Sequence, residues 1–169
     1  MNKNEEKFML MMDALNEDGS VNPDVVRFSY NGHEGSFTPV GNCMAFEIDG
    51  LWGFADPDGY FATPPQYEDV ILPIQRDSAK IVGVKMGEKW AIADICGKLL
   101  TEFKYDSVEE IINGYASVEI DDKRGFVNGK GKELCEIKYD EVYFFRKGKA
   151  KVALGGEEFY INSNGKRVE

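Results

Sequence analysis

Hydrophobic and polar residues alternate in short segments along most of the chain after residue 42. Trp52 and Phe54 stand two residues apart before a turn-forming stretch, and Trp90 and Ile92 do the same before the next one. Because successive side chains of a β-strand point to opposite faces, a period of two places these side chains on one face. The pattern predicts short β-strands joined by tight turns.

This pattern occurs four times, and each copy ends in Asp or Asn, two variable residues and Gly. The closing glycines follow one another at intervals of 38, 34 and 34 residues: Gly59, Gly97, Gly131 and Gly165. A fixed period in this range marks a repeat architecture. Asp or Asn at the first position and Gly at the fourth fit a type I turn followed by a left-handed glycine, which closes a β-hairpin. We therefore expect a positive φ at all four glycines.

A second landmark follows the turn in three copies, where a tyrosine precedes an acidic residue and, three positions on, a valine. The tyrosines are Tyr67, Tyr105 and Tyr139. One repeat is therefore a strand, a hairpin turn, a second strand, a glycine-centred turn and a short third strand. We place the repeats at residues 42–74, 75–112, 113–146 and 147–169, within one structural domain.

The motif Trp-Gly-Phe-x-Asp-x-x-Gly, followed by a tail of Tyr, an acidic residue, x and Val, resembles the bacterial WG repeat family over about residues 42–169. The Trp-Gly pair is intact only at Trp52-Gly53, and the fourth copy stops at Val168 without its tail. The resemblance implies an all-β protein of tandem antiparallel repeats that serves as an interaction module. It implies no catalytic residues, because none are attached to the repeat motif.

The aligned apolar residues are expected to form the core. They are Trp52, Phe54, Trp90, Ile92, Phe126 and Tyr160, with Val70, Val108 and Val142 from the tails. Four units of this kind stack as an open array or close like a small barrel or propeller. We favour a short, twisted open array.

Residues 1–41 are expected to form an N-terminal helix and a cap hairpin. Phe8, Met11, Met12 and Leu15 lie on one face of a helix predicted over residues 4–17. Asn31-Gly32 favours a tight hairpin turn within an irregular β segment at residues 20–41. The helix would cover one open end of the array, because stacked repeats expose an edge there. The alternative is a detachable helix for a partner or for dimerisation.

The charge of the chain narrows the range of partners. The formal net charge is −10, and the basic residues are scattered apart from a small run at Arg146-Lys147-Gly148-Lys149. This balance argues against nucleic acids and against anionic membrane surfaces, which both require a basic face. An acidic surface would suit a basic partner.

Three cysteines, Cys43, Cys96 and Cys135, are an odd number without the spacing of a metal site. The polar N-terminus shows no signal peptide, and no apolar run approaches the length of a membrane span. The simplest interpretation is a protein of the reducing cytoplasm.

No motif of catalysis or cofactor binding is present, so we predict neither a cofactor nor a metal and no enzymatic activity. His33, the single histidine, has no cysteine or acid at a diagnostic spacing and is interpreted as a loop residue. Asp56-Pro57-Asp58-Gly59 begins like a calcium loop, but the ligand set is incomplete and Pro57 suits a turn. A hydrolase that uses two of the 30 acidic residues stays open as an alternative.

The periodic tyrosines Tyr67, Tyr105 and Tyr139 are the candidate binding residues. Their rings are either half-buried with the hydroxyls bonded to neighbours, or form an aromatic row that a glycan or an extended peptide would contact. The leading hypothesis is a module that binds a protein partner through a repeat face. The alternative is a glycan- or peptide-binding module that uses the tyrosine row.

Overall fold

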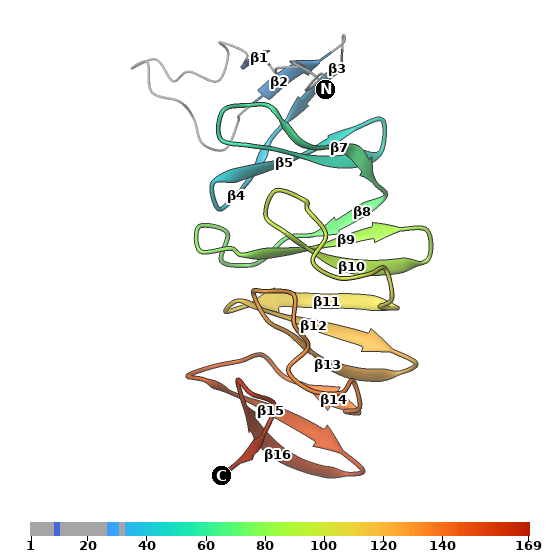
Figure 1. Ribbon diagram of the computed structural model, residues 1–169, viewed down its shortest axis with the longest axis vertical. Helices are drawn as coiled ribbons and strands as arrows, with labels where there is room; N and C mark the ends of the chain where they lie inside the picture. The colour runs from blue at the N-terminus through green and yellow to red at the C-terminus, as the bar shows by residue number, and fades with distance from the viewer. Residues whose placement is uncertain (1–8, 11–26, 31–32) are drawn as a thin grey trace.

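The computed structural model describes residues 9–10, 27–30 and 33–169 (Figure 1). In these residues the regular elements are β-strands, which form five antiparallel sheets. Grouped by sheet, the strands are β1 (Met9–Leu10), β2 (Arg27–Tyr30) and β3 (His33–Ser36); β4 (Thr38–Val40), β5 (Cys43–Ile48), β6 (Leu51–Ala55) and β7 (Phe61–Tyr67); β8 (Asp69–Ile71), β9 (Ile81–Met86) and β10 (Lys89–Asp94); β11 (Ser107–Ile112), β12 (Tyr115–Ile120) and β13 (Lys123–Val127); and β14 (Glu141–Val142), β15 (Lys149–Leu154), β16 (Glu157–Asn162) and β17 (Arg167–Val168).

The sheets follow one another along the long axis of the molecule (Figure 1). The sheet of β2 and β3 lies at one end, and the sheet of β15 and β16 lies at the other. The array is therefore open and does not close on itself as a barrel or a propeller. Each sheet packs on its neighbours, and the last sheet has no sheet of this chain beyond it.

Sheets and sequence repeats are offset from one another. The tail strand of one repeat pairs with the first strand of the next, so that Val70 lies opposite Val84, and Val108 opposite Val118. In the same way β14 pairs with β15. Each of the first three sequence repeats thus contributes strands to two sheets, and backbone hydrogen bonds join neighbouring repeats.

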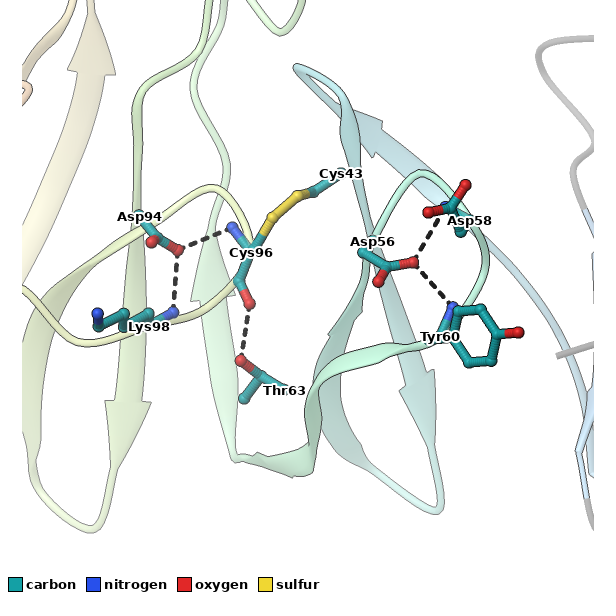
Figure 2. Close-up of a disulfide and its surroundings, with 8 residues drawn as sticks. All are labelled: Cys43, Asp56, Asp58, Tyr60, Thr63, Asp94, Cys96 and Lys98. Carbon is teal, nitrogen blue, oxygen red and sulfur yellow. Dashed lines mark hydrogen bonds between the residues drawn. A yellow bond between two sulfur atoms is a disulfide. The ribbon is translucent and has the colours of Figure 1, made fainter. Parts of the chain in front are cut away.

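The four glycine-centred turns have the same structure, as the sequence predicts. The φ angles of the closing glycines are 82°, 83°, 77° and 71° for Gly59, Gly97, Gly131 and Gly165. In each turn the glycine N–H donates to the carbonyl of the Asp or Asn three residues earlier, at 2.9–3.0 Å. The side-chain oxygen of that Asp or Asn accepts two further backbone N–H groups (Figure 2 shows this at Asp56 and Asp94).

The turn acceptor can be tested at Asn128, whose Oδ1 accepts the N–H groups of Lys130 at 2.9 Å and Lys132 at 3.1 Å. Asn128→Ala removes this acceptor and should lower the free energy of unfolding by about 1 kcal/mol, the usual effect of losing a capping side chain. Asn128→Asp keeps an oxygen at the same place and should be close to neutral, since Asp56 and Asp94 do the same in their turns. Urea denaturation of the two variants measures the difference, and equal losses would contradict this role.

Most of the predicted core is buried: Phe54, Trp90, Ile92, Phe126 and Val108 are at most 9% exposed. Trp52, Val70 and Val142 are partly buried against the same clusters. Tyr160 was expected in the core, but it is 40% exposed. Its equivalent Phe126 is covered by Phe145 of the loop before β15, whereas no such ring among the described residues covers Tyr160.

The N-terminal helix is not supported. Met9 and Leu10 form β1 and pair with Ser29 and Phe28 of β2, so the helix prediction is wrong at these two residues. An edge strand offers unpaired backbone groups to a neighbouring segment, and β1 uses the groups of β2. The rest of residues 4–17 and the Asn31-Gly32 turn lie outside the described residues.

Candidate functional site

The three periodic tyrosines are buried between units rather than displayed on a face. Tyr67, Tyr105 and Tyr139 are 2%, 0% and 2% exposed. The Tyr67 hydroxyl donates to the carbonyl of Gly97 at 2.7 Å, and the Tyr105 hydroxyl donates to Glu133 Oε1 at 2.8 Å. The Tyr139 hydroxyl lies 3.5 Å from Sγ of Cys135. Tyr67 and Tyr105 thus tie one repeat to the turn region of the next.

Burial raises the pKa of each of these tyrosines above its ordinary value, with a further increase from Asp94 at Tyr67 and from Glu133 at Tyr105. The hydroxyls of Tyr67 and Tyr105 therefore stay protonated and keep donating. The rings do not form the exposed row that a stacked sugar or peptide would need. The periodicity of these residues comes from the contacts between repeats.

Two of the cysteines are paired. Cys43, at the start of β5, forms a disulfide with Cys96 in the turn after β10, with 5.5 Å between the Cα atoms (Figure 2). The carbonyl of Cys96 also accepts a hydrogen bond from Thr63 Oγ1 at 2.7 Å. Sequence spacing gave no sign of this pair, because the two residues are brought together only by the packing of one sheet on the next. Cys135 is free.

Other candidate chemistry is sparse in the described part of the chain. No group of three or more His, Cys, Asp or Glu side chains there is arranged to hold a metal ion. Asp56 uses its carboxylate within the turn, where it accepts the N–H groups of Asp58 and Tyr60. The side chain of His33 lies outside the described residues. The described residues also contain no helix with the length and apolar character of a membrane span.

A cavity of about 370 Å³ lies on the outer face of the last sheet. We call this surface the end face and define it by the residues that line the cavity: Tyr143, Phe144, Arg146, Lys147, Lys149, Lys151 and Tyr160. Three aromatic side chains and four basic side chains thus meet at one place.

The strand pattern of the last sheet produces the end face. In β15, Ala150 and Val152 point toward the preceding unit and are buried, whereas Lys149 and Lys151 alternate with them and point outward. Tyr160 of β16 lies opposite Lys151 and shares its face. The Lys149 ammonium lies 4.7 Å from the centre of the Tyr160 ring.

The connection between β14 and β15 supplies the remaining side chains. Phe145 anchors it, because its buried ring stacks on Tyr115 at 4.1 Å between centroids. Its neighbour Phe144 points outward and is 52% exposed, the most exposed aromatic ring among the described residues. Lys147 and Gly148 form the tight turn that follows, both with positive φ. The two outward aromatic rings, Phe144 and Tyr143, are thus held by a fixed loop.

A comparison with the preceding repeat, 34 residues earlier, shows how much this surface differs. Tyr143 and Phe144 occupy the positions of Glu109 and Glu110. The basic residues Lys147, Lys149 and Lys151 occupy those of Asn113, Tyr115 and Ser117. At these five positions two acids are thus replaced by aromatic residues and three uncharged residues by lysines. This repeat-to-repeat comparison is the sequence signal that would have found the end face.

Most of the end-face cations lack a carboxylate partner. Lys151 pairs with Glu158, but Arg146, Lys147 and Lys149 are exposed and form no ion pair among the described residues. In the middle repeats Lys89, Lys104, Lys123 and Arg124 each pair with a carboxylate, whereas Lys98 and Lys130 form no ion pair among the described residues. The end face is thus a local basic surface on a chain with a net charge of −10.

A second cavity of about 360 Å³ lies between the turn regions of the second and third repeats. Its lining includes Lys104 and Glu133, which form an ion pair at 2.7 Å. Glu133 also accepts the hydrogen bond of the buried Tyr105. Lys104, Tyr105 and Glu133 thus already bind one another, so this cavity is interpreted as a seam between repeats.

Comparisons with known proteins agree with the repeat pattern. A family described as "WG containing repeat" matches residues 52–90, 94–123 and 125–157. Among solved structures, the chain is similar to "KlHsv2 with loop 6CD replaced by a Gly-Ser linker", with 12% sequence identity and a TM-score of 0.43. The similarity covers 78% of this chain and 49% of that chain, so this chain spans about half of its length. None of the curated proteins matches this chain.

Proposed function

This chain belongs to the WG repeat family, and from that premise we propose that it is a non-enzymatic module that binds a protein partner through its end face. The observation that carries the proposal is the exposure of Phe144 and Tyr160 beside Arg146, Lys147 and Lys149 on the last sheet. Exposed aromatic residues and arginine are enriched in protein interfaces, where aromatic anchors contribute much of the binding energy.

The packing of the array explains why this face is available. Inside the array each sheet is covered by the next unit, as Phe126 is by Phe145, with ring centroids 4.9 Å apart. The equivalent ring of Tyr160 has no such cover from the described residues of this chain. Tyr160 of the proposed binding surface thus occupies the position at which Phe126 contacts the neighbouring sheet.

The expectation of a glycan bound on the tyrosine row receives no support, since those rings are buried. A basic partner was expected from the net charge alone. The end face is basic although the chain as a whole is acidic, so its local side chains and not the net charge determine the charge of a partner bound there. The cellular location also stays a prediction: a reducing cytoplasm would keep Cys43 and Cys96 as thiols, whereas an oxidising compartment would keep their disulfide.

The proposal is tested by capturing partners from an extract of the native host with the protein and with the double variant Phe144→Ser, Tyr160→Ser. We expect the double variant to lose its partner, because truncating a central aromatic residue of an interface typically costs about 2 kcal/mol or more. Quantitative mass spectrometry of the captured proteins measures the loss.

The matched control is Leu51→Ser, Leu99→Ser, which removes two apolar side chains that are 38% and 42% exposed on other units. This control should retain the partner. Equal capture by all three proteins would place the interaction elsewhere and would refute the end face as the docking surface.

A further inference from the structure

We propose that the end face takes an acidic protein segment that carries an aromatic or aliphatic anchor side chain. This inference rests on the proposed function and adds the chemistry of the partner. The anchor would enter the cavity of about 370 Å³, beside Phe144 and Tyr160. The carboxylates that flank the anchor would meet Arg146, Lys147 and Lys149.

Charge complementarity supports an acidic occupant. Residues 143–151 contain four basic side chains and no acidic one. Three of the four form no ion pair among the described residues, so they are able to bind carboxylates without giving up a partner. Attraction between complementary patches raises the association rate and selects against partners of the wrong sign.

The aromatic side chains restrict the class of partner further, because a purely acidic segment would leave these rings exposed to water. Tyr143, Phe144 and Tyr160 are 42%, 52% and 40% exposed. The ammonium groups of Lys149 and Lys151 lie over the Tyr160 and Tyr143 rings, at 4.7 and 5.5 Å from their centres. An apolar anchor beside these rings would bury them while the lysines stay within reach of the flanking carboxylates.

Another repeat unit, including one from a second copy of this chain, fits this face poorly. At the contact between the sheet of β12 and the sheet of β15, Tyr115 stacks on Phe145. Lys149 occupies the position of Tyr115, so an apolar unit stacked here would bury an ammonium group without a counter-charge. Burying an unpaired charge is strongly unfavourable.

A nucleic acid fits poorly as well, although aromatic and basic residues also suit single strands. Glu141 and Glu158 border the face, since they contact Tyr143 and Lys151. A strand that extends beyond the cavity would place its phosphates against these carboxylates and against a chain of net charge −10. A short acidic peptide covers only the basic centre.

The experiment uses fluorescence anisotropy with the full chain and a labelled peptide in which one Phe is flanked on both sides by Glu and Asp. Three further probes test its features: the same peptide with Ser for Phe, the same peptide with Lys for every acid, and a single-stranded oligonucleotide of thymidines. We expect only the first probe to bind. Its affinity should fall about tenfold when NaCl is raised from about 0.05 to about 0.5 M, because salt screens the charges.

Two double variants change the net charge of the protein by the same amount, one at the end face and the other elsewhere. Lys147→Glu, Lys149→Glu reverses two end-face charges and should weaken binding of the acidic peptide by about tenfold or more. Lys98→Glu, Lys130→Glu reverses two exposed charges on other units and should leave binding within about twofold of the parent protein. Circular dichroism of both variants checks that they fold.

The acidic class is refuted if the parent protein does not bind the first peptide, binds the lysine peptide equally well, or binds only the oligonucleotide. Equal weakening by both charge variants would also overturn it, since the effect would then be that of net charge. If the native partner still depends on Phe144 and Tyr160 in the capture experiment, the proposed function survives this outcome. If capture of the partner does not depend on Phe144 and Tyr160, the proposed function is refuted whatever the peptide experiment shows.

Discussion

Reduction of the disulfide between Cys43 and Cys96 is expected to lower the free energy of unfolding by about 4 kcal/mol. The two residues are 53 positions apart in sequence, and a crosslink that closes a loop of this length removes much conformational entropy from the unfolded chain. The bond also joins β5 to the turn after β10, so it holds two neighbouring sheets together. The measurement is urea denaturation followed by tryptophan fluorescence, with and without a thiol reductant.

Cys135 provides the control for this experiment. It is free, and its sulfur lies 3.5 Å from the Tyr139 hydroxyl. The variant Cys135→Ser should lose stability on reduction as the parent does. The double variant Cys43→Ser, Cys96→Ser should be insensitive to the reductant. A parent protein whose unfolding curve is the same in both conditions would show that the bond does not form in solution.

Gly97→Ala is expected to lower the free energy of unfolding by about 2–5 kcal/mol. Gly97 has a φ of 83°, and this left-handed conformation costs a non-glycine residue about 1–2 kcal/mol. A Cβ atom there would also stand 2.4 Å from Cδ2 of Phe54 and 2.7 Å from Oγ1 of Thr63. Overpacking of this kind adds about 1–3 kcal/mol.

Gly114→Ala separates the two contributions. Gly114 has the same φ of 83°, but a Cβ atom there would meet nothing within 4 Å. Its substitution should therefore cost only the backbone part, about 1–2 kcal/mol. The difference between the two variants in urea denaturation reports the close packing of a turn on the preceding unit. Equal losses would mean that the turn of Gly97 does not pack tightly against Phe54.

The local parts of the fold could be predicted from the sequence because they depend on neighbouring residues. The turns at Gly59, Gly97, Gly131 and Gly165 are closed by side chains within four residues, so their chemistry is visible in the motif. The strands before them follow from the alternation of apolar residues. The N-terminal segment shows the limit of such patterns, since Met9 and Leu10 lie within the predicted helix of residues 4–17 but pair with β2.

The contacts between units were not predictable in this way. Tyr67 and Tyr105 were recognised as periodic, but only the stacking of sheets shows that their hydroxyls bind the next turn region and that their rings are buried. The Cys43–Cys96 pair likewise depends on the position of one sheet against the next. Periodicity reports that a residue has a repeated environment and does not report whether that environment is solvent or protein.

The sequence by itself determined the repeat, its turns and its strands, because hydrogen bonds within a few residues and the two-residue period of a strand set them. The tertiary structure decided which faces are covered. Phe126 and Tyr160 occupy equivalent positions, yet the first is buried and the second exposed, because Phe145 packs on the first and no described residue takes its place on the second. The end face follows from this difference, since burial depends on what lies beyond a sheet and not on the strand that carries the residue.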